Sequence, residues 1–486
     1  MLQRQAARLV QLGLAFVASV IIARTLGPRG AGLYAAVLAL VVLAQGLASF
    51  GLEDLVLARG PALGVDSSAA REIYAGALRL RLWTGALFLV AAACIALFAS
   101  RDPLGSGSVW TLASAAAYAG FNGVASLGSV IEAARFRAGS AALLDTTWSV
   151  LVTAAFAGLA ATSSLTVVHA LVATAGTQFA VSVWYLAVLR EVRSSPRPVV
   201  RLRELGPFWL NGLLSIGVGK TADVLAMRAA GAGAKPTGFY STGYNAFQTG
   251  AQSIVEGLGL VSYVGLGRVF GSHASRETVA SSWRLTALLA LLVSSPVLAG
   301  LALYPDALIT GLYGSPFAPA ARVVRILAIS AILARTIGGG SSQSLLLVAG
   351  RQRTVVRIRG VLVIANVIGD VVLYRALGIT GVAISTCVSG FLIGVAELVV
   401  ARRIAPVRPP LRAAAVMTSA SIAGGWLLSL FVKVDRLVLV VAAVVLAGVA
   451  HGAALLAFKP IRSSDITPAM IGEGRAARLL RLMAHD

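Results

Sequence analysis

Long apolar segments recur along the whole sequence and decide what the chain can fold into. Each approaches the roughly 20 residues that a helix needs to cross a bilayer. The chain of 486 residues is 58% hydrophobic and 12% charged, whereas soluble globular proteins carry about 25% charged residues. Alternating ten-residue strands of the membrane-barrel type are absent from the sequence. The sequence therefore predicts an all-α polytopic membrane protein.

Fourteen segments have the length and hydropathy of transmembrane helices. Because this number is even, both termini are expected on the same side of the membrane. The predicted spans cover residues 8–27, 33–53, 80–99, 109–131, 143–162, 167–189, 208–229, 239–262, 283–304, 326–348, 358–376, 380–400, 413–432 and 437–458.

Basic residues are distributed unevenly between the two sides of these spans. The net charge of +22 would suggest nucleic-acid binding in a soluble protein. Here 29 of the 41 basic residues fall on the side of the termini and ten on the other side, which is the pattern of a cytoplasmic and an outer face. We therefore expect a plasma-membrane location, cytoplasmic termini and no nucleic-acid partner.

The connections between spans are too short to hold a soluble domain. The longest, residues 54–79, contains the helix-compatible sequence SSAAREIYAGALRLRL and is predicted to lie on the cytoplasmic face of the membrane. The basic tail, residues 461–486, either rests on anionic lipid or is a frayed terminus. Cys94 and Cys387 both fall inside spans, so no disulfide framework is expected.

The sequence also contains a weak internal repeat with an offset of 206 residues. Spans one to six would correspond to spans seven to twelve, and such parallel repeats place a substrate path at the interface of two lobes. We therefore predict a six-helix lobe over residues 1–207, a second over 208–407, two further helices over 408–460 and the tail. The matched pairs are Gly32 with Gly238, Tyr34 with Tyr240, Gly51 with Gly257 and Leu52 with Leu258.

Several motifs occur in the order typical of one transporter family. They are IIARTLGPRGAGLYAAVLAL, FGLEDLVLAR, Asp223 followed by TGFYSTGYNAF, LITGLYGSPFAPAARVVRILAIS, LLLVAGRQRTVVRIRG and NVIGDVVLYRALGITGVAIST. Together they resemble the oligosaccharide-lipid flippases of the polysaccharide transporter family. That family belongs to the superfamily that also contains the multidrug and toxin extruders and the lipid II flippases.

This resemblance implies a flippase that moves a polyprenyl-diphosphate-linked oligosaccharide from the inner to the outer leaflet. Two lobes would open alternately to each side of the membrane. The partners would be the lipid-linked oligosaccharide, membrane lipids, and a polysaccharide polymerase or glycosyltransferases. No cofactor and no metal are expected.

Two cations, Lys220 and Arg335, lie near the middle of predicted spans, where charge is costly and commonly functional. Arg335 has no acid near it in sequence, and a guanidinium can bind a phosphate through two hydrogen bonds. Alternatively, Arg335 pairs with Asp223 or Glu256. Lys220 and Asp223 share one helix face and form a cavity pair, an ion-coupled switch or a self-contained ion pair.

Other polar residues in the spans are weaker candidates. Arg24 and Arg228 would line the exit of a cavity or snorkel to the outer head groups. Glu256 would be a proton or sodium site, or an interfacial acid paired with a loop arginine. Asn211 and Gln248 would bind sugar hydroxyls or join helices. Five acids at span ends are interpreted as interfacial: Glu53, Asp54, Asp145, Asp370 and Glu397.

Catalytic motifs are absent from the sequence. It has no phosphate-binding P-loop, no HExxH and no serine-triad motif, so we do not expect an enzyme. The main alternative is a cation-coupled multidrug exporter of the same superfamily, which would need a cavity dominated by acids. A polytopic glycan ligase or polymerase would need a large outer loop, which the predicted topology does not provide.

Overall fold

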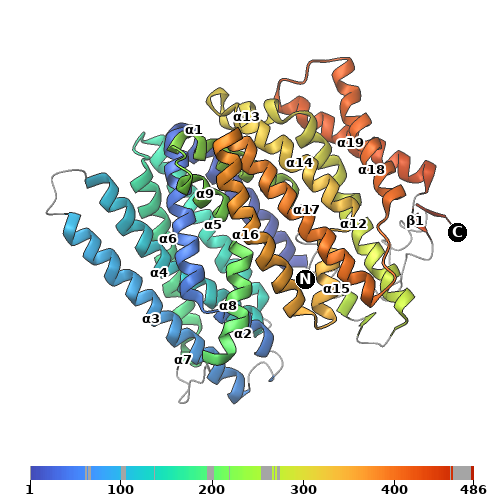
Figure 1. The fold of residues 1–486 in the computed structure, drawn as a ribbon. Helices are drawn as coiled ribbons and strands as arrows, with labels where there is room; N and C mark the ends of the chain where they lie inside the picture. The colour runs from blue at the N-terminus through green and yellow to red at the C-terminus, as the bar shows by residue number, and fades with distance from the viewer. Residues whose placement is uncertain are drawn as a thin grey trace. The chain divides into compact units, whose positions relative to one another are not determined.

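The computed structural model describes residues 2–60, 63, 67–99, 106–135, 137–193, 202–217, 219–252, 265–267, 269–270, 274–459, 461–462 and 483–485, which are almost entirely helical (Figure 1). The first half contains α1 Leu2–Ser49, α2 Leu52–Arg59, α3 Ser68–Ala99, α4 Ser106–Ala134, α5 Ala138–Ala161, α6 Val167–Val188, α7 Arg190–Arg193, α8 Leu202–Gly217, α9 Lys220–Ala229 and α10 Ala234–Phe247. The second half contains the π-helix η2 Gln248–Gln252, α12 Arg276–Leu303, α13 Pro305–Tyr313, η3 Ser315–Phe317, α14 Ala320–Thr336, α15 Ser341–Val348, α16 Gln352–Leu377, α17 Ile379–Ile404, α18 Leu411–Leu427, η4 Leu428–Leu430 and α19 Leu437–Phe458. A short parallel pair joins β1 Ile461–Arg462 to β2 Ala484–His485.

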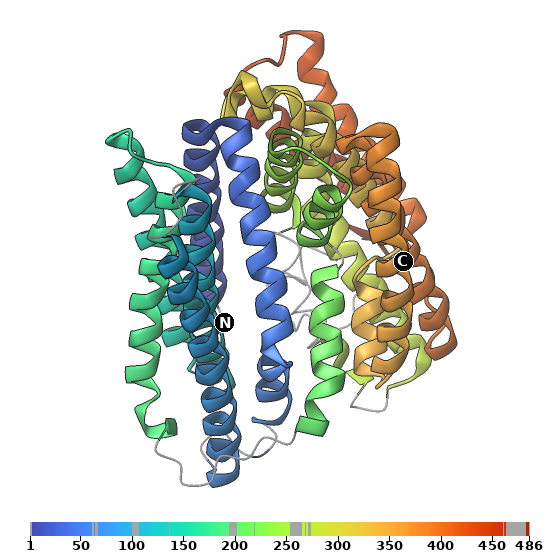
Figure 2. The same cartoon turned by 60° about the vertical axis from the view of Figure 1, so that its left-hand side comes forward.

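Most predicted spans fall on helices of the structure, although α3 begins at Ser68, before the predicted start at residue 80. Within the described residues, eight helices are by themselves long and apolar enough to cross a bilayer. The first two predicted spans together form α1, which is interrupted by the non-helical Gly27 and by Pro28. Figure 2 shows that the chain reverses direction there. Other spans consist of two shorter helices in succession, such as α8 with α9 and α14 with α15. The described part of span eight is α10 with η2.

The chain divides into two compact units, Met1–Ser241 and Thr242–Asp486. The repeat predicts a lobe boundary at residues 207 and 208 instead. Helices α8 and α9 fall in the first unit because both pack against α1. The indole Nε1 of Trp209 in α8 lies 3.1 Å from the carbonyl oxygens of Gly46 and Leu47 and donates to them. The predicted lobe boundaries stay a prediction.

Helices α1 and α10 cross at two glycines that the repeat had paired. A Cβ placed on Gly32 would lie 1.8 Å from the carbonyl oxygen of Ala234 and 2.6 Å from the nitrogen of Gly238. A Cβ on Gly238 would lie 1.9 Å from the carbonyl oxygen of Pro28. The two contacts are reciprocal, since Ala234 stands 206 residues after Pro28. Only glycine at both positions lets the backbones approach this closely.

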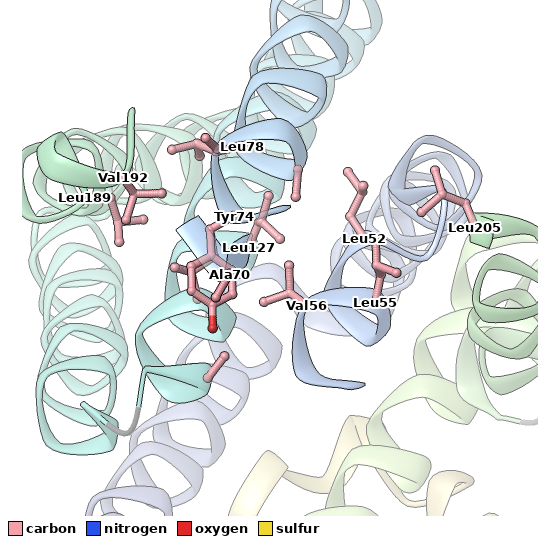
Figure 3. Packing of buried hydrophobic residues seen from close by; sticks show 14 residues of the cluster. Leu52, Leu55, Val56, Ala70, Tyr74, Leu78, Leu127, Leu189, Val192 and Leu205 are labelled. Atoms are coloured by element: carbon pink, nitrogen blue, oxygen red, sulfur yellow. The ribbon is translucent and has the colours of Figure 1, made fainter. Parts of the chain in front are cut away.

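A hydrophobic cluster joins the ends of five helices in the first unit (Figure 3). Leu52, Leu55 and Val56 of α2 pack with Tyr74 and Leu78 of α3 and with residues of α4, α7 and α8. The segment that was predicted to be helical and to lie on the cytoplasmic face of the membrane is helical, and its position relative to the membrane stays a prediction. It forms the first turns of α3, and its Ala70 and Tyr74 are fully buried, because the apolar side of this stretch has protein to pack against.

The second unit is built around α12. This helix packs against α14, α18 and α19, while α14 also packs against α17. Trp283 of α12 is fully buried in a cluster with Leu345 of α15 and Leu398 of α17. Pro296 lies inside α12, where it removes one backbone hydrogen bond.

Candidate functional site

The strongest sequence candidates lie where membrane helices are interrupted. Helix α8 ends at Gly217 and α9 begins at Lys220 after the extended residue Gly219. Helix α14 ends just after Arg335, and α15 begins at Ser341 after Gly338 and Gly340, which have positive φ angles. Irregular backbone at membrane depth is tolerated only inside protein or along a water-filled cavity. The interruptions therefore mark the positions where polar chemistry is sheltered from lipid.

Asp223 lies in the first turn of α9 and is fully buried. The hydroxyl of Tyr240 in α10 donates a hydrogen bond to its carboxylate oxygen Oδ2. Lys220, half-buried, begins the same turn of α9. Asp223 thus has a hydrogen-bond partner on a neighbouring helix. The hypothesis of a self-contained ion pair between Lys220 and Asp223 did not include this partner. This hydrogen bond joins α9 to α10 beside the helix interruption.

Arg335 occupies the last turn of α14 and is half-buried. Its Nη1 donates a hydrogen bond of 3.2 Å to the carbonyl oxygen of Gly339. The side chain therefore satisfies one backbone group that the interruption releases. Among the residues that the structure describes, no carboxylate forms an ion pair with Arg335. The guanidinium retains N–H groups that can bind a phosphate.

Asn211 of α8 contacts an acid in α2, the short helix that follows α1. Its Nδ2 lies 3.5 Å from Oδ2 of Asp54 in α2. Burial raises the pKa of the Asp54 carboxyl above its ordinary value, while the hydrogen bond from Asn211 acts in the opposite direction. Asn211 therefore positions α8 against α2, as a residue that joins helices would.

The remaining candidates are dispersed. Arg24 is exposed in α1, and Arg228 is exposed in the last turn of α9, where its Nη1 donates to the carbonyl oxygen of Ala232 at 2.6 Å. Half-buried Gln248 begins the π-helix η2. Glu256 lies outside the described residues. Lys220, Asp223, Asn211, Arg24 and Arg228 belong to the first compact unit, and Arg335 and Gln248 belong to the second.

Two of the acids at predicted span ends are buried among protein groups, while their depth in the membrane stays a prediction. Asp370 of α16 is fully buried, and its Oδ2 accepts a hydrogen bond of 3.0 Å from Nδ2 of Asn366. Ser385 of α17 donates to the carbonyl oxygen of Asn366. Glu397 of α17 is 2% exposed and pairs with Arg359 at 3.3 Å. In the sequence, the only indication that Asp370 is buried was the polar residue Asn366, which precedes it by about one helical turn.

Asp145 and Glu53 are also held by protein groups. Asp145 accepts hydrogen bonds from Ser129 at 2.8 Å and from the hydroxyl of Tyr185 at 3.0 Å. Glu53 pairs with Arg81, which is 4% exposed and also donates to the carbonyl oxygen of Ala48. Arg81 therefore ties the end of α1 to the start of α2.

The architecture is that of a multi-pass helical membrane protein, and several solved structures share its fold. The solved lipid II flippase MurJ in an inward closed conformation matches 94% of this chain and 99% of its own, with a TM-score of 0.66 and 11% identity. An inward-facing multidrug resistance MATE transporter of the MOP superfamily matches 83% of this chain and 97% of its own, with a TM-score of 0.62 and 15% identity. A MOP superfamily transporter from Pyrococcus furiosus has a TM-score of 0.54 at 15% identity and matches 83% of this chain and 94% of its own.

A family model described as polysaccharide biosynthesis protein matches residues 21–322. The chain belongs to this family. No curated protein is significantly similar in sequence. The predicted all-α polytopic membrane fold and the predicted family relationship are both confirmed.

Proposed function

We propose that this protein is a flippase for a polyprenyl-diphosphate-linked oligosaccharide. It would move its substrate from the inner to the outer leaflet by alternating access, in surface polysaccharide or cell-envelope synthesis. The observation that carries the proposal is a half-buried guanidinium, Arg335, at a helix interruption inside a predicted membrane span. Membership of the polysaccharide biosynthesis protein family and the fold shared with MurJ support the same conclusion.

A sugar-diphosphate head group cannot cross hydrocarbon alone because its charges and hydroxyls would lose their hydration. Arg335 would bind the diphosphate through two hydrogen bonds, which a lysine cannot reproduce. Lys220, Arg24, Arg228, Asn211 and Gln248 would supply further positive charge or hydrogen bonds along the path. The prenyl chain would stay in lipid, so only the head group would need shelter.

Ion coupling would be carried by buried carboxylates. Asp223 is the first candidate because it is buried beside a helix interruption. Asp370, which is fully buried and accepts a hydrogen bond from the side-chain amide of Asn366, is a second. Glu256 is a third from the sequence alone. Protonation or cation binding at such an acid would remove a charge that is costly at this depth.

The protein would work in the plasma membrane with both termini cytoplasmic, as a transporter and not an enzyme. Glycosyltransferases would supply its substrate, and a polysaccharide polymerase would act on its product. The second candidate function is a cation-coupled multidrug exporter. The fold shared with MATE transporters and the buried acids Asp223 and Asp370 favour it.

Substitution of Arg335 tests the proposal directly. In cells that depend on this protein for glycan export, Arg335→Ala should abolish export without lowering the protein's abundance in the membrane. Arg335→Lys should restore only part of it, since the lysine keeps the charge but loses the paired hydrogen bonds.

Arg322→Ala is the matched control, because Arg322 is exposed on the same helix α14. Unchanged export by Arg335→Ala would contradict the role of Arg335. Export of cationic dyes, with no effect on the glycan, would instead establish the multidrug exporter.

A further inference from the structure

One end of the second unit carries a dense group of exposed arginines. They come from the start of α12, the start of α16, the end of α17 and the connection into α18. We call this group the basic rim, and it comprises Arg276, Arg351, Arg353, Arg357, Arg402, Arg403, Arg408 and Arg412. In the predicted topology this end is cytoplasmic.

The four elements of the basic rim lie together. Arg276 donates from Nε to the carbonyl oxygen of Ile404 at 2.9 Å and from Nη2 to that of Arg403 at 3.2 Å, so the start of α12 contacts the end of α17. Helices α16 and α17 are both 26 residues long, are joined at Gly378 and pack against each other. The start of α16 therefore lies beside the end of α17.

The basic rim meets apolar side chains that have no protein cover. Along α16, Arg357 is followed on the same face by Val361, Ile364, Ile368 and Val372, whose exposures are 68%, 63%, 58% and 57%. Their spacing of three or four residues makes one continuous stripe. In a membrane such a stripe faces acyl chains, so Arg357 stands where the head groups begin.

Helix α17 repeats this arrangement. Val388, Leu392 and Val399 are exposed, and Arg403 follows Val399 by four residues on the same face. Two neighbouring helices thus each carry an apolar stripe that ends in an arginine at the same end of the unit. This arrangement matches a phospholipid, whose acyl chains would lie along the apolar stripe and whose phosphate would meet the arginine at its end.

Among the residues that the structure describes, no carboxylate is paired with an arginine of the basic rim. Of the nearby acids, Glu277 is exposed, while Glu397 is buried and paired with Arg359. In the first unit, by contrast, the buried Arg81 and Arg135 pair with Glu53 and Glu132. The basic rim therefore favours an external anion.

We propose that the basic rim is a docking surface for the head groups of anionic phospholipids. Arg357 and Arg403 hold the phosphate of a lipid whose chains lie along the stripes of α16 and α17. The other arginines of the basic rim raise the local concentration of such lipids. This surface is separate from Arg335 and does not depend on the identity of the transported glycan.

Lipid binding by the purified full-length protein tests this proposal. The protein is reconstituted in nanodiscs of phosphatidylcholine with increasing phosphatidylglycerol, and the affinity for phosphatidylglycerol is measured by native mass spectrometry. Wild-type protein should prefer phosphatidylglycerol. Arg357→Gln with Arg403→Gln should weaken this binding about fivefold per arginine, which follows from about 1 kcal/mol for each basic residue near an anionic surface.

Arg375→Gln is the matched control, because Arg375 is exposed at the opposite end of α16. It should leave the affinity unchanged, and Arg357→Lys with Arg403→Lys should retain most of it. The proposal is overturned if wild-type protein shows no preference, or if the control weakens binding as much as the double variant. Loss of binding to undecaprenyl diphosphate alone, with phosphatidylglycerol binding unchanged, would also overturn it and would assign the surface to the substrate.

Discussion

Among the described residues, each buried carboxylate is held by a hydrogen-bond donor from the protein. Tyr240 donates to Asp223, Asn366 donates to Asp370, and Arg359 pairs with Glu397. An isolated carboxylate at membrane depth would be very costly. The donors lower that cost and leave each acid in a defined position. A change in protonation or in bound cation at Asp223 or Glu397 would therefore change a contact between two helices, whereas at Asp370 it would change a contact within α16.

Asp223 and Tyr240 allow this idea to be tested at a single hydrogen bond. If Asp223 couples an ion, Asp223→Asn should alter the pH or sodium dependence of transport, because the amide cannot exchange a proton or neutralise a cation. Tyr240→Phe keeps the carboxylate but removes its donor, which should cost about 1–3 kcal/mol of stability. Transport by reconstituted protein across a series of pH and sodium values measures the first effect.

Thermal unfolding measures the loss of stability in Tyr240→Phe. An unaltered pH and sodium dependence in Asp223→Asn would leave Asp223 with a structural role only. In that case the coupling would have to come from a different acid, and Asp370→Asn would be the next variant to compare.

Helix interruptions are the elements that the sequence shows least directly. The membrane helices could be predicted as a class because about 20 apolar residues in succession have few alternatives, while their number of fourteen stays a prediction. The run Gly338–Gly340 gave a signal for the interruption between α14 and α15. For the interruption before Lys220, the only sequence signal was the two glycines Gly217 and Gly219. The hydrogen bond between Tyr240 and Asp223 could not be predicted because it depends on tertiary contacts. Likewise, the burial of Asp370 depends on how α16 packs against α17, which periodicity alone does not reveal.

Gly338 should be essential for the interruption beside Arg335. Its φ angle is +77°, and a Cβ there would lie 2.5 Å from the indole ring of buried Trp283. Gly338→Ala should therefore combine backbone strain of about 1–2 kcal/mol with an overpacking cost of about 1–3 kcal/mol. The expected result is a clear fall in the midpoint of thermal unfolding in detergent.

Gly350 provides the control for this substitution. Its φ angle is +71°, but a Cβ there would meet nothing within 4 Å. Gly350→Ala should show the backbone strain alone and a smaller fall. Equal falls for the two variants would show that the contact with Trp283 contributes nothing.

At the scale of the whole chain, α1 and α10 approach each other closely although they are far apart in sequence. The repeat identified Gly32 and Gly238 as equivalent positions, and the structure brings their backbones into contact. Sequence comparison within one chain could show the equivalence, but it could not show the contact. The two compact units and the predicted lobes also differ because α8 and α9 pack against α1.

Alanine at Gly32 should separate α1 from α10. The added methyl would overlap the carbonyl oxygen of Ala234, so Gly32→Ala should lower thermal stability and reduce transport. Gly176 of α6 is the control, because a Cβ there would meet nothing within 4 Å. Gly176→Ala should be neutral or stabilise the protein by up to about 1 kcal/mol. Tolerance of Gly32→Ala would show that the two helices do not need this close approach.

The crossing of α1 and α10 also has a consequence for biosynthesis. The two glycines are 206 residues apart, so the surface of α1 around Gly32 has no cover while the intervening helices are being made. Contacts between distant segments form late and delay folding. The first unit can therefore reach its final packing only after α10 has entered the membrane. Until then, the insertion machinery or lipid must cover a patch of bare backbone on the earliest helix.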